Sequence, residues 1–100
     1  MTGGDDVVAD EVLGLFVEQA SMWSAMLDAR TDGWRDAVHT IRGAAAGIGA
    51  GALAGVCADV EVADQAVAAP GLDRVRDALD MALADVAAWR HELMLRSLKT

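Results

Sequence analysis

Apolar residues recur at spacings of three and four along almost the whole chain, and little in it favours strand. This spacing is typical of amphipathic helices, because such residues share one helix face. The apolar positions fall into four stripes: Leu13, Phe16, Ala20, Trp23 and Leu27; Trp34, Val38, Ile41, Ala45 and Ile48; Leu53, Val56, Cys57, Val60 and Val67; and Leu72, Val75, Leu79, Ala82, Val86, Trp89 and Leu93. The stripes have no apolar partner except one another, so we expect them to pack together.

Capping and breaking residues suggest where these helices begin and end. Ser21 is a possible cap for a restart, which predicts two helices in the first segment, at about residues 6–19 and 21–30. Thr31 and Asp32 are N-cap candidates for the next helix. Gly49–Gly51 is expected to form a C-cap and turn. Ala68–Gly71 is expected to end the third segment, because proline cannot continue a helix.

Short connections make neighbouring helices antiparallel. We therefore predict an all-α fold, an up-down antiparallel four-helix bundle with an extra short N-terminal helix. Residues 1–100 are expected to form a single domain, since a chain of this length supports one core.

Composition narrows the class of protein. The chain is 54% hydrophobic, has no tyrosine and carries a formal net charge of −8, without a visible basic stripe for nucleic acid. The N-terminus, MTGGDDVV, lacks a secretory signal, and the uncharged run 43–58 is too short and too rich in Ala and Gly to span a bilayer. We expect a cytoplasmic protein, and a free-standing protein is favoured over a domain of a longer chain. The lone Cys57 is expected to be a buried thiol.

Five glycines lie between Gly43 and Gly55, and GIGAGA within them matches a dinucleotide-binding pattern. That pattern works only where glycines follow a strand and open a helix. Here the preceding residues are helical and the glycines end the helix. The nucleotide interpretation is therefore rejected, and no ATP-binding, metal-ligand or Ser-His-Asp motif is found elsewhere.

His39 follows Val38 of the inward stripe, so its side chain is turned about 100° away from the core, towards solvent or the bundle edge. Helical spacing places Arg35, Arg42, Gly43 and Ala46 on its face. Glycine inside a helix costs about 1 kcal/mol relative to alanine, which suggests that a side chain there would obstruct a partner. Gly47 extends this clearing, and Arg42 supplies a cation suited to a transferring phosphoryl group. On these grounds alone, an ordinary surface histidine remains an equal alternative.

The stretch HTIRGAAAGIGAGALAGVCADVE, 39–61, resembles the signature of the histidine phosphotransfer (HPt) domain family. LFVEQA before it, DGWRDAVHTIRG around its start and the last helical segment extend the resemblance over most of the chain. The resemblance implies that His39 is the phosphorylated histidine and that Gly43 is the family glycine. It further implies that Arg42 replaces the usual lysine and that Glu61 orients the imidazole from the neighbouring helix.

By this resemblance, His39 accepts a phosphoryl group from a receiver-domain phosphoaspartate and passes it to another receiver aspartate. The receiver is expected to bring Mg²⁺ and to dock on Arg35, Ala46 and Gly47, and the chain is expected to be a monomeric phosphocarrier with no cofactor and no kinase activity. A carboxylate at Nδ1 would fix the tautomer that leaves Nε2 nucleophilic. The alternatives are a non-catalytic helical adaptor that binds or sequesters a receiver, and a structural bundle that dimerises through its Ala/Gly face. His91, without a following glycine, is expected to be an ordinary surface residue.

Overall fold

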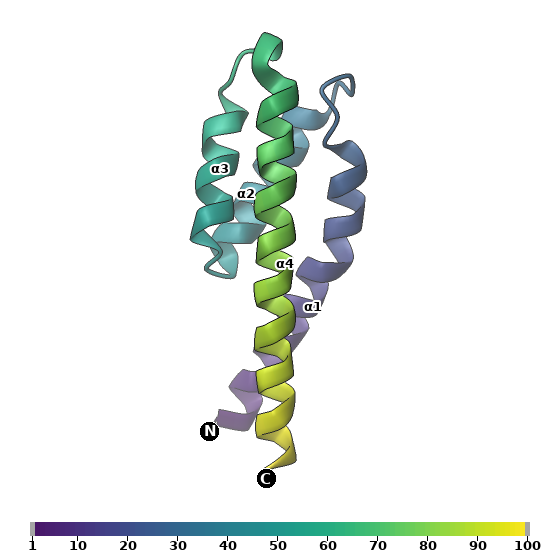
Figure 1. The fold of residues 1–100 in the computed structure, drawn as a ribbon. Coiled ribbons are helices and arrows are strands. Elements are labelled where there is room, and N and C mark those ends of the chain that lie inside the picture. Colours follow the sequence, from purple (N-terminus) through teal and green to yellow (C-terminus); the bar gives the residue numbers. More distant parts are fainter. Residues whose placement is uncertain (1, 100) are drawn as a thin grey trace.

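The computed structural model describes residues 2–99, which are almost entirely helical and contain no strand (Figure 1). The elements are α1 (Thr2–Met26), α2 (Trp34–Gly47), α3 (Gly51–Glu61), a 3-10 turn η1 (Gln65–Val67) and α4 (Ala68–Leu98). The predicted all-α class with four helices is confirmed. None of the helices in this range is long and apolar enough to cross a membrane.

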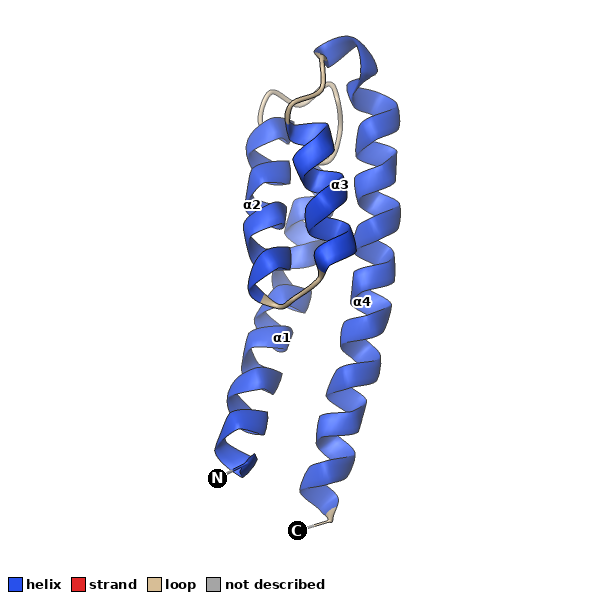
Figure 2. Cartoon of the chain, turned by 90° about the vertical axis from the view of Figure 1, so that its left-hand side faces the viewer, coloured by secondary structure: helices blue, strands red, loops and turns tan. Residues whose placement is uncertain are grey.

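Successive helices run in opposite directions, with both ends of the chain at the same end of the molecule (Figure 2). The helices pack as a closed ring, α1 on α2, α2 on α3, α3 on α4 and α4 on α1. Because α2 and α3 are short, α1 and α4 continue past them as a two-helix extension, visible in the lower half of Figure 1. The result is an elongated molecule of 54 × 19 × 17 Å.

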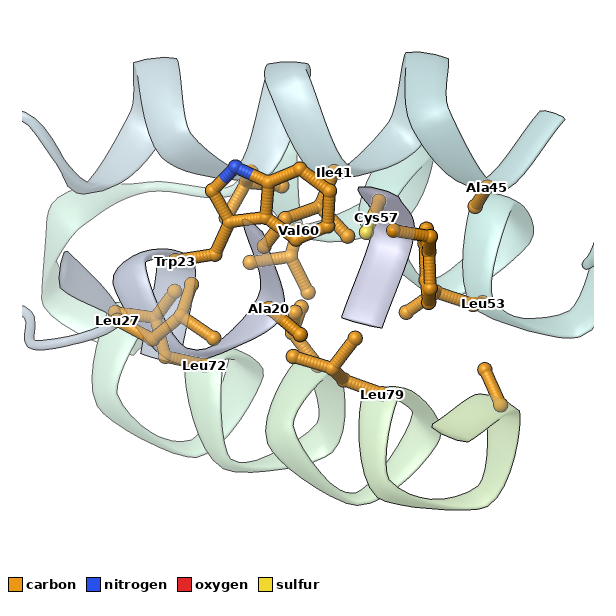
Figure 3. Packing of buried hydrophobic residues seen from close by; sticks show 14 of the residues in the cluster. Ala20, Trp23, Leu27, Ile41, Ala45, Leu53, Cys57, Val60, Leu72 and Leu79 are labelled. Carbon is orange, nitrogen blue, oxygen red and sulfur yellow. The ribbon is translucent and has the colours of Figure 1, made fainter. Parts of the chain in front are cut away.

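The core lies where all four helices meet. Figure 3 shows the packed side chains from α1 (Ala20, Trp23), the residue after it (Leu27), α2 (Ile41, Ala45), α3 (Leu53, Cys57, Val60) and α4 (Leu72, Leu79). Gly71 permits the close approach of α4 to α3, since a Cβ there would stand 3.2 Å from both methyl groups of Val60. Among the side chains that the structure describes, none that is polar or charged is buried. Burial of apolar surface is therefore the main interaction that holds the four helices together.

The predicted break at Ser21 is wrong. Ser21 lies inside α1, where its hydroxyl donates to the carbonyl of Glu18 at 3.3 Å. Serine can satisfy its hydroxyl within a helix in this way, so it does not force a restart. The separate short N-terminal helix is therefore absent from residues 2–99, and α1 ends at Met26.

Two other boundaries differ from expectation. The third segment ends at Glu61, and Ala68–Gly71 begins α4 where we expected a helix to end. Pro70 fits there because a residue in the first helical turn needs no intrahelical partner for its N–H. Neither Thr31 nor Asp32 caps α2, which starts after Gly33 without a side-chain cap. The turn at 49–51 is present, with Gly49 at φ +79°.

Two residues of the predicted stripes lie outside the core. Val67 is exposed in η1, and Trp89 is 43% exposed on the extension of α4 beyond α2 and α3. Val67 lies in the turn before α4, and on the extension only α1 packs against α4, so periodicity alone overstated the burial of both residues.

Candidate functional site

His39 lies on the outer face of α2, and 73% of its side chain is exposed. The neighbouring Val38 is fully buried, so the inward stripe of α2 fixes the direction in which the imidazole points. His39 Nδ1 lies 2.6 Å from Oε1 of Glu61. A carboxylate only accepts hydrogen bonds, so the proton of this contact belongs to Nδ1 and the Nε2 lone pair is left for chemistry.

Glu61 is the last residue of α3, and its side chain is only 17% exposed. Its second carboxylate oxygen, Oε2, accepts a hydrogen bond of 3.1 Å from the Arg42 guanidinium. One carboxylate therefore contacts both the imidazole and the cation, which lie three residues apart on α2. This sharing holds the ring in one orientation, because each oxygen has its own partner.

Arg42 is partly accessible, with 47% of its side chain exposed. A planar guanidinium has five N–H donors, so the contact with Glu61 leaves others for a negatively charged group. The positive charge lies one helical turn from His39, at the position where the family resemblance expects lysine.

Gly43 and Gly47 are exposed on α2, and an ideal Cβ at either position meets no heavy atom within 4 Å. Internal packing therefore does not require glycine at these positions. Ala46 is exposed on the same helix. The surface beside the imidazole is thus built from residues with little or no side chain, and it is open in the free protein.

Arg35 was expected on this docking face, and the structure gives its guanidinium a different set of contacts. Nη1 donates to the main-chain carbonyl of Glu61, and Nη2 donates to the carbonyl of Ala63 at 3.1 Å. The guanidinium carbon stands 4.4 Å from the ring centroid of Trp34. Arg35 thus joins the beginning of α2 to the end of α3.

Gln65 helps to hold the connections next to the site, a role that was not predicted from the sequence. Its side-chain oxygen accepts a 3.0 Å bond from the buried Trp34 indole, and its nitrogen donates to the carbonyl of Ala29 at 2.9 Å. These bonds tie the connection after α3 to the connection before α2. A single glutamine in a polar loop gave no signal of this role.

Cys57 is fully buried beneath this site. Burial, and secondarily the negative charge of Glu61, raise the pKa of its thiol to about 11. The thiol therefore stays neutral at physiological pH and is a poor nucleophile. Within residues 2–99, no three His, Cys, Asp or Glu side chains gather as potential metal ligands.

His91 is exposed on α4, as expected of a surface residue. It lies on the extension beyond the end of α2, far along the chain from Glu61. Of the two histidines, only His39 has the contacts with a carboxylate that orient a ring for chemistry.

Comparison with known proteins agrees with this geometry. The family model of the Hpt domain matches residues 11–89. A crystal structure of the histidine phosphotransferase ShpA from Caulobacter crescentus is 53% identical, with a TM-score of 0.75, over 89% of this chain and 81% of that one. Among curated protein sequences, none matches the chain. The chain therefore belongs to the Hpt domain family, and its role lies in a phosphorelay.

Proposed function

We propose that the protein is a phosphorelay intermediate that carries a phosphoryl group on His39. A receiver domain bearing phosphoaspartate donates the group, and the aspartate of another receiver domain takes it. The observation that carries this proposal is the exposed imidazole whose Nδ1 contacts Glu61 while Glu61 also contacts Arg42. The similarity to a histidine phosphotransferase supports the same assignment.

In the first step, the Nε2 lone pair attacks phosphorus. The N–P bond forms as the P–O bond to the receiver aspartate breaks, and the aspartate carboxylate leaves with that electron pair. The proton on Nδ1 stays in place, where Glu61 stabilises the positive charge that develops on the ring. The Arg42 guanidinium neutralises part of the phosphoryl charge. A second receiver reverses these events, with its aspartate oxygen attacking phosphorus and Nε2 leaving.

The receivers would supply Mg²⁺ and the acidic pocket, and this chain would need no cofactor of its own. Positioning and charge stabilisation are the main contributions a protein makes to phosphoryl transfer. Accordingly, the chain would be a phosphocarrier without autokinase activity, and its up-down antiparallel bundle would serve as a rigid support. Docking would use the small-residue surface of Gly43, Ala46 and Gly47, with the cation of Arg42 facing the acidic pocket. We further propose that the protein acts as a cytoplasmic monomer.

The experiment is a transfer assay with a panel of receiver domains, each charged with a labelled phosphoryl group. The variants are His39→Gln and, as the matched control, His91→Gln on the exposed surface of α4. We expect acid-labile, base-stable label on the wild type and on His91→Gln, and none on His39→Gln. Binding of charged receivers without label on the chain would instead support the adaptor. Sedimentation at several concentrations tests the monomer against a dimer formed through the Ala/Gly face.

A further inference from the structure

Arg35 contacts the end of α3, the helix whose last residue is Glu61. The final carbonyls of an α-helix have no partner inside the helix, and cationic side chains stabilise that end. Arg35 supplies a donor to the carbonyl of Glu61 and a second donor to the carbonyl of Ala63, two residues on. The two terminal nitrogens of one guanidinium thus hold the main chain on both sides of Val62.

The position of Arg35 is itself fixed. Its guanidinium stacks on Trp34, whose own ring is buried and donates to Gln65. Gln65 in turn is bonded to the carbonyl of Ala29. A planar group held on an aromatic face and bonded through both terminal nitrogens has little freedom to swing away.

Residues on one face of α2 therefore bind both the main chain and the side chain of Glu61. Arg35 binds its main-chain carbonyl, while His39 and Arg42 bind its two carboxylate oxygens. These three α2 residues are separated by four and three positions, so they lie along one side of the helix. Glu61 stands at a helix end, where the backbone frays most readily, and its carboxylate is correctly placed only if that end stays closed.

We infer that Arg35 is a positioning residue for phosphoryl transfer, acting through Glu61 on the tautomer of His39. The inference rests on the proposed function. It differs from a role in docking or in binding phosphate, because both terminal nitrogens of Arg35 are directed at main-chain oxygens of the α3 end. Loss of the guanidinium releases the Glu61 main chain, and the carboxylate then spends less time on Nδ1.

The test uses Arg35→Met, which keeps an unbranched stem without the donors, and Arg35→Lys, which keeps the charge but not the fork. Arg74→Met is the matched control, because Arg74 also reaches the last turn of α3 but pairs there with a side chain, that of Asp59, at 3.8 Å. Long-range ¹H–¹⁵N spectra of the His39 ring at pH 8.5, above the usual histidine range, report which nitrogen carries the proton. Transfer rates are measured from a charged receiver and from phosphoramidate, a small phosphodonor that needs no docking surface.

We expect Arg35→Met to move proton population from Nδ1 to Nε2 and to slow transfer from both donors about tenfold, as when a group that supports a reacting residue is removed. Arg35→Lys should lie between Arg35→Met and the wild type, and Arg74→Met should match the wild type. Slow transfer from Arg35→Met with unchanged ring nitrogen shifts would overturn the inference, because Arg35 would then act on the partner or the phosphoryl group. Unchanged shifts and unchanged rates would overturn it as well.

The ring spectra separate this inference from the proposed function. A wild type that no donor phosphorylates contradicts the phosphorelay role, and the shift of the Nδ1 proton in Arg35→Met still decides the positioning role. Thermal unfolding of each variant verifies the fold. If Arg35→Met does not fold, a wild-type ring spectrum in folded Arg35→Lys contradicts the inference.

Discussion

Replacement of Gly43 by leucine should change stability and transfer in opposite directions. Gly43 lies in the interior of α2, and no heavy atom stands within 4 Å of its ideal Cβ position. Glycine costs a helix interior about 0.8–1.0 kcal/mol relative to alanine, and leucine ranks just below alanine. Gly43→Leu should therefore raise the free energy of unfolding by about 0.5–1 kcal/mol. For a domain of this size, that corresponds to a midpoint higher by roughly 2–8 °C.

The same substitution should block transfer. The leucine side chain would stand one helical turn from His39, on the open surface that we propose for receiver docking. A displacement of about 1 Å between reacting groups costs on the order of 10²-fold in rate, so we expect at least that loss. Gly43→Ala should be stabilised similarly and lose less transfer.

The assay combines thermal unfolding by circular dichroism with the rate of phosphoryl transfer from a charged receiver. Gly55→Leu is the control, because Gly55 is exposed inside α3 and also has no atom within 4 Å of its Cβ position. It should be stabilised with its transfer rate intact. A stabilised Gly43→Leu protein that transfers at the wild-type rate would refute the proposed docking surface. A destabilised Gly43→Leu protein would refute the expectation that a side chain at position 43 meets no other atoms.

Three further perturbations test the site and the core. Glu61→Ala should slow transfer roughly 10- to 100-fold without abolishing it, since a hydrogen bond to a charged group contributes about 1.5–3 kcal/mol. Glu61→Gln, which keeps an acceptor, should lose less, and an unchanged rate in Glu61→Ala would contradict a role of Glu61 in transfer. The free energy of unfolding should fall as pH rises from 9 to 11, because the unfolded Cys57 thiol loses its proton near 9 while the native pKa is about 11. Because the native state keeps that proton to higher pH, the loss of unfolding free energy approaches about 2 kcal/mol. Cys57→Ala should flatten the dependence of the unfolding free energy on pH, as measured by urea unfolding. The chain has no tyrosine that would titrate in the same pH range. Leu79→Ala should lower the free energy of unfolding in urea by about 2–5 kcal/mol, because the leucine is buried in the core. Val62→Ala, at a 79% exposed position, should change it by no more than about 0.5 kcal/mol. Equal effects of the two substitutions would contradict the packing described.

Periodicity predicted the elements better than it predicted their ends. The spacing of Val38, Ile41 and Ala45 placed α2 and the direction of His39 correctly, because a helix turns by a fixed angle per residue. Ser21 and Pro70 misled, since each residue type has two roles, inside a helix or at its boundary. Which role applies depends on hydrogen bonds that only the folded chain makes.

The candidate site, too, could be predicted from the sequence only in part. The face shared by His39, Arg42 and Gly43 follows from helical spacing within one element. The contact of Glu61 with His39 spans two helices and was expected only from the family resemblance. Bonds from side chains to distant main-chain carbonyls, such as those of Arg35, have no sequence pattern, because every residue offers the same carbonyl.

The imidazole of His39 is exposed on the outer face of α2, so no lid has to open before a partner reaches it. For a phosphocarrier built in this way, the frequency of productive collisions sets the pace of exchange at low partner concentration, as in other encounters between preformed surfaces. Flux through the carrier would then scale with receiver abundance and fall with ionic strength wherever charge steers the approach. The same openness gives bulk water access to the carried group, so its lifetime would depend on the chemistry of the N–P bond more than on shielding by the fold.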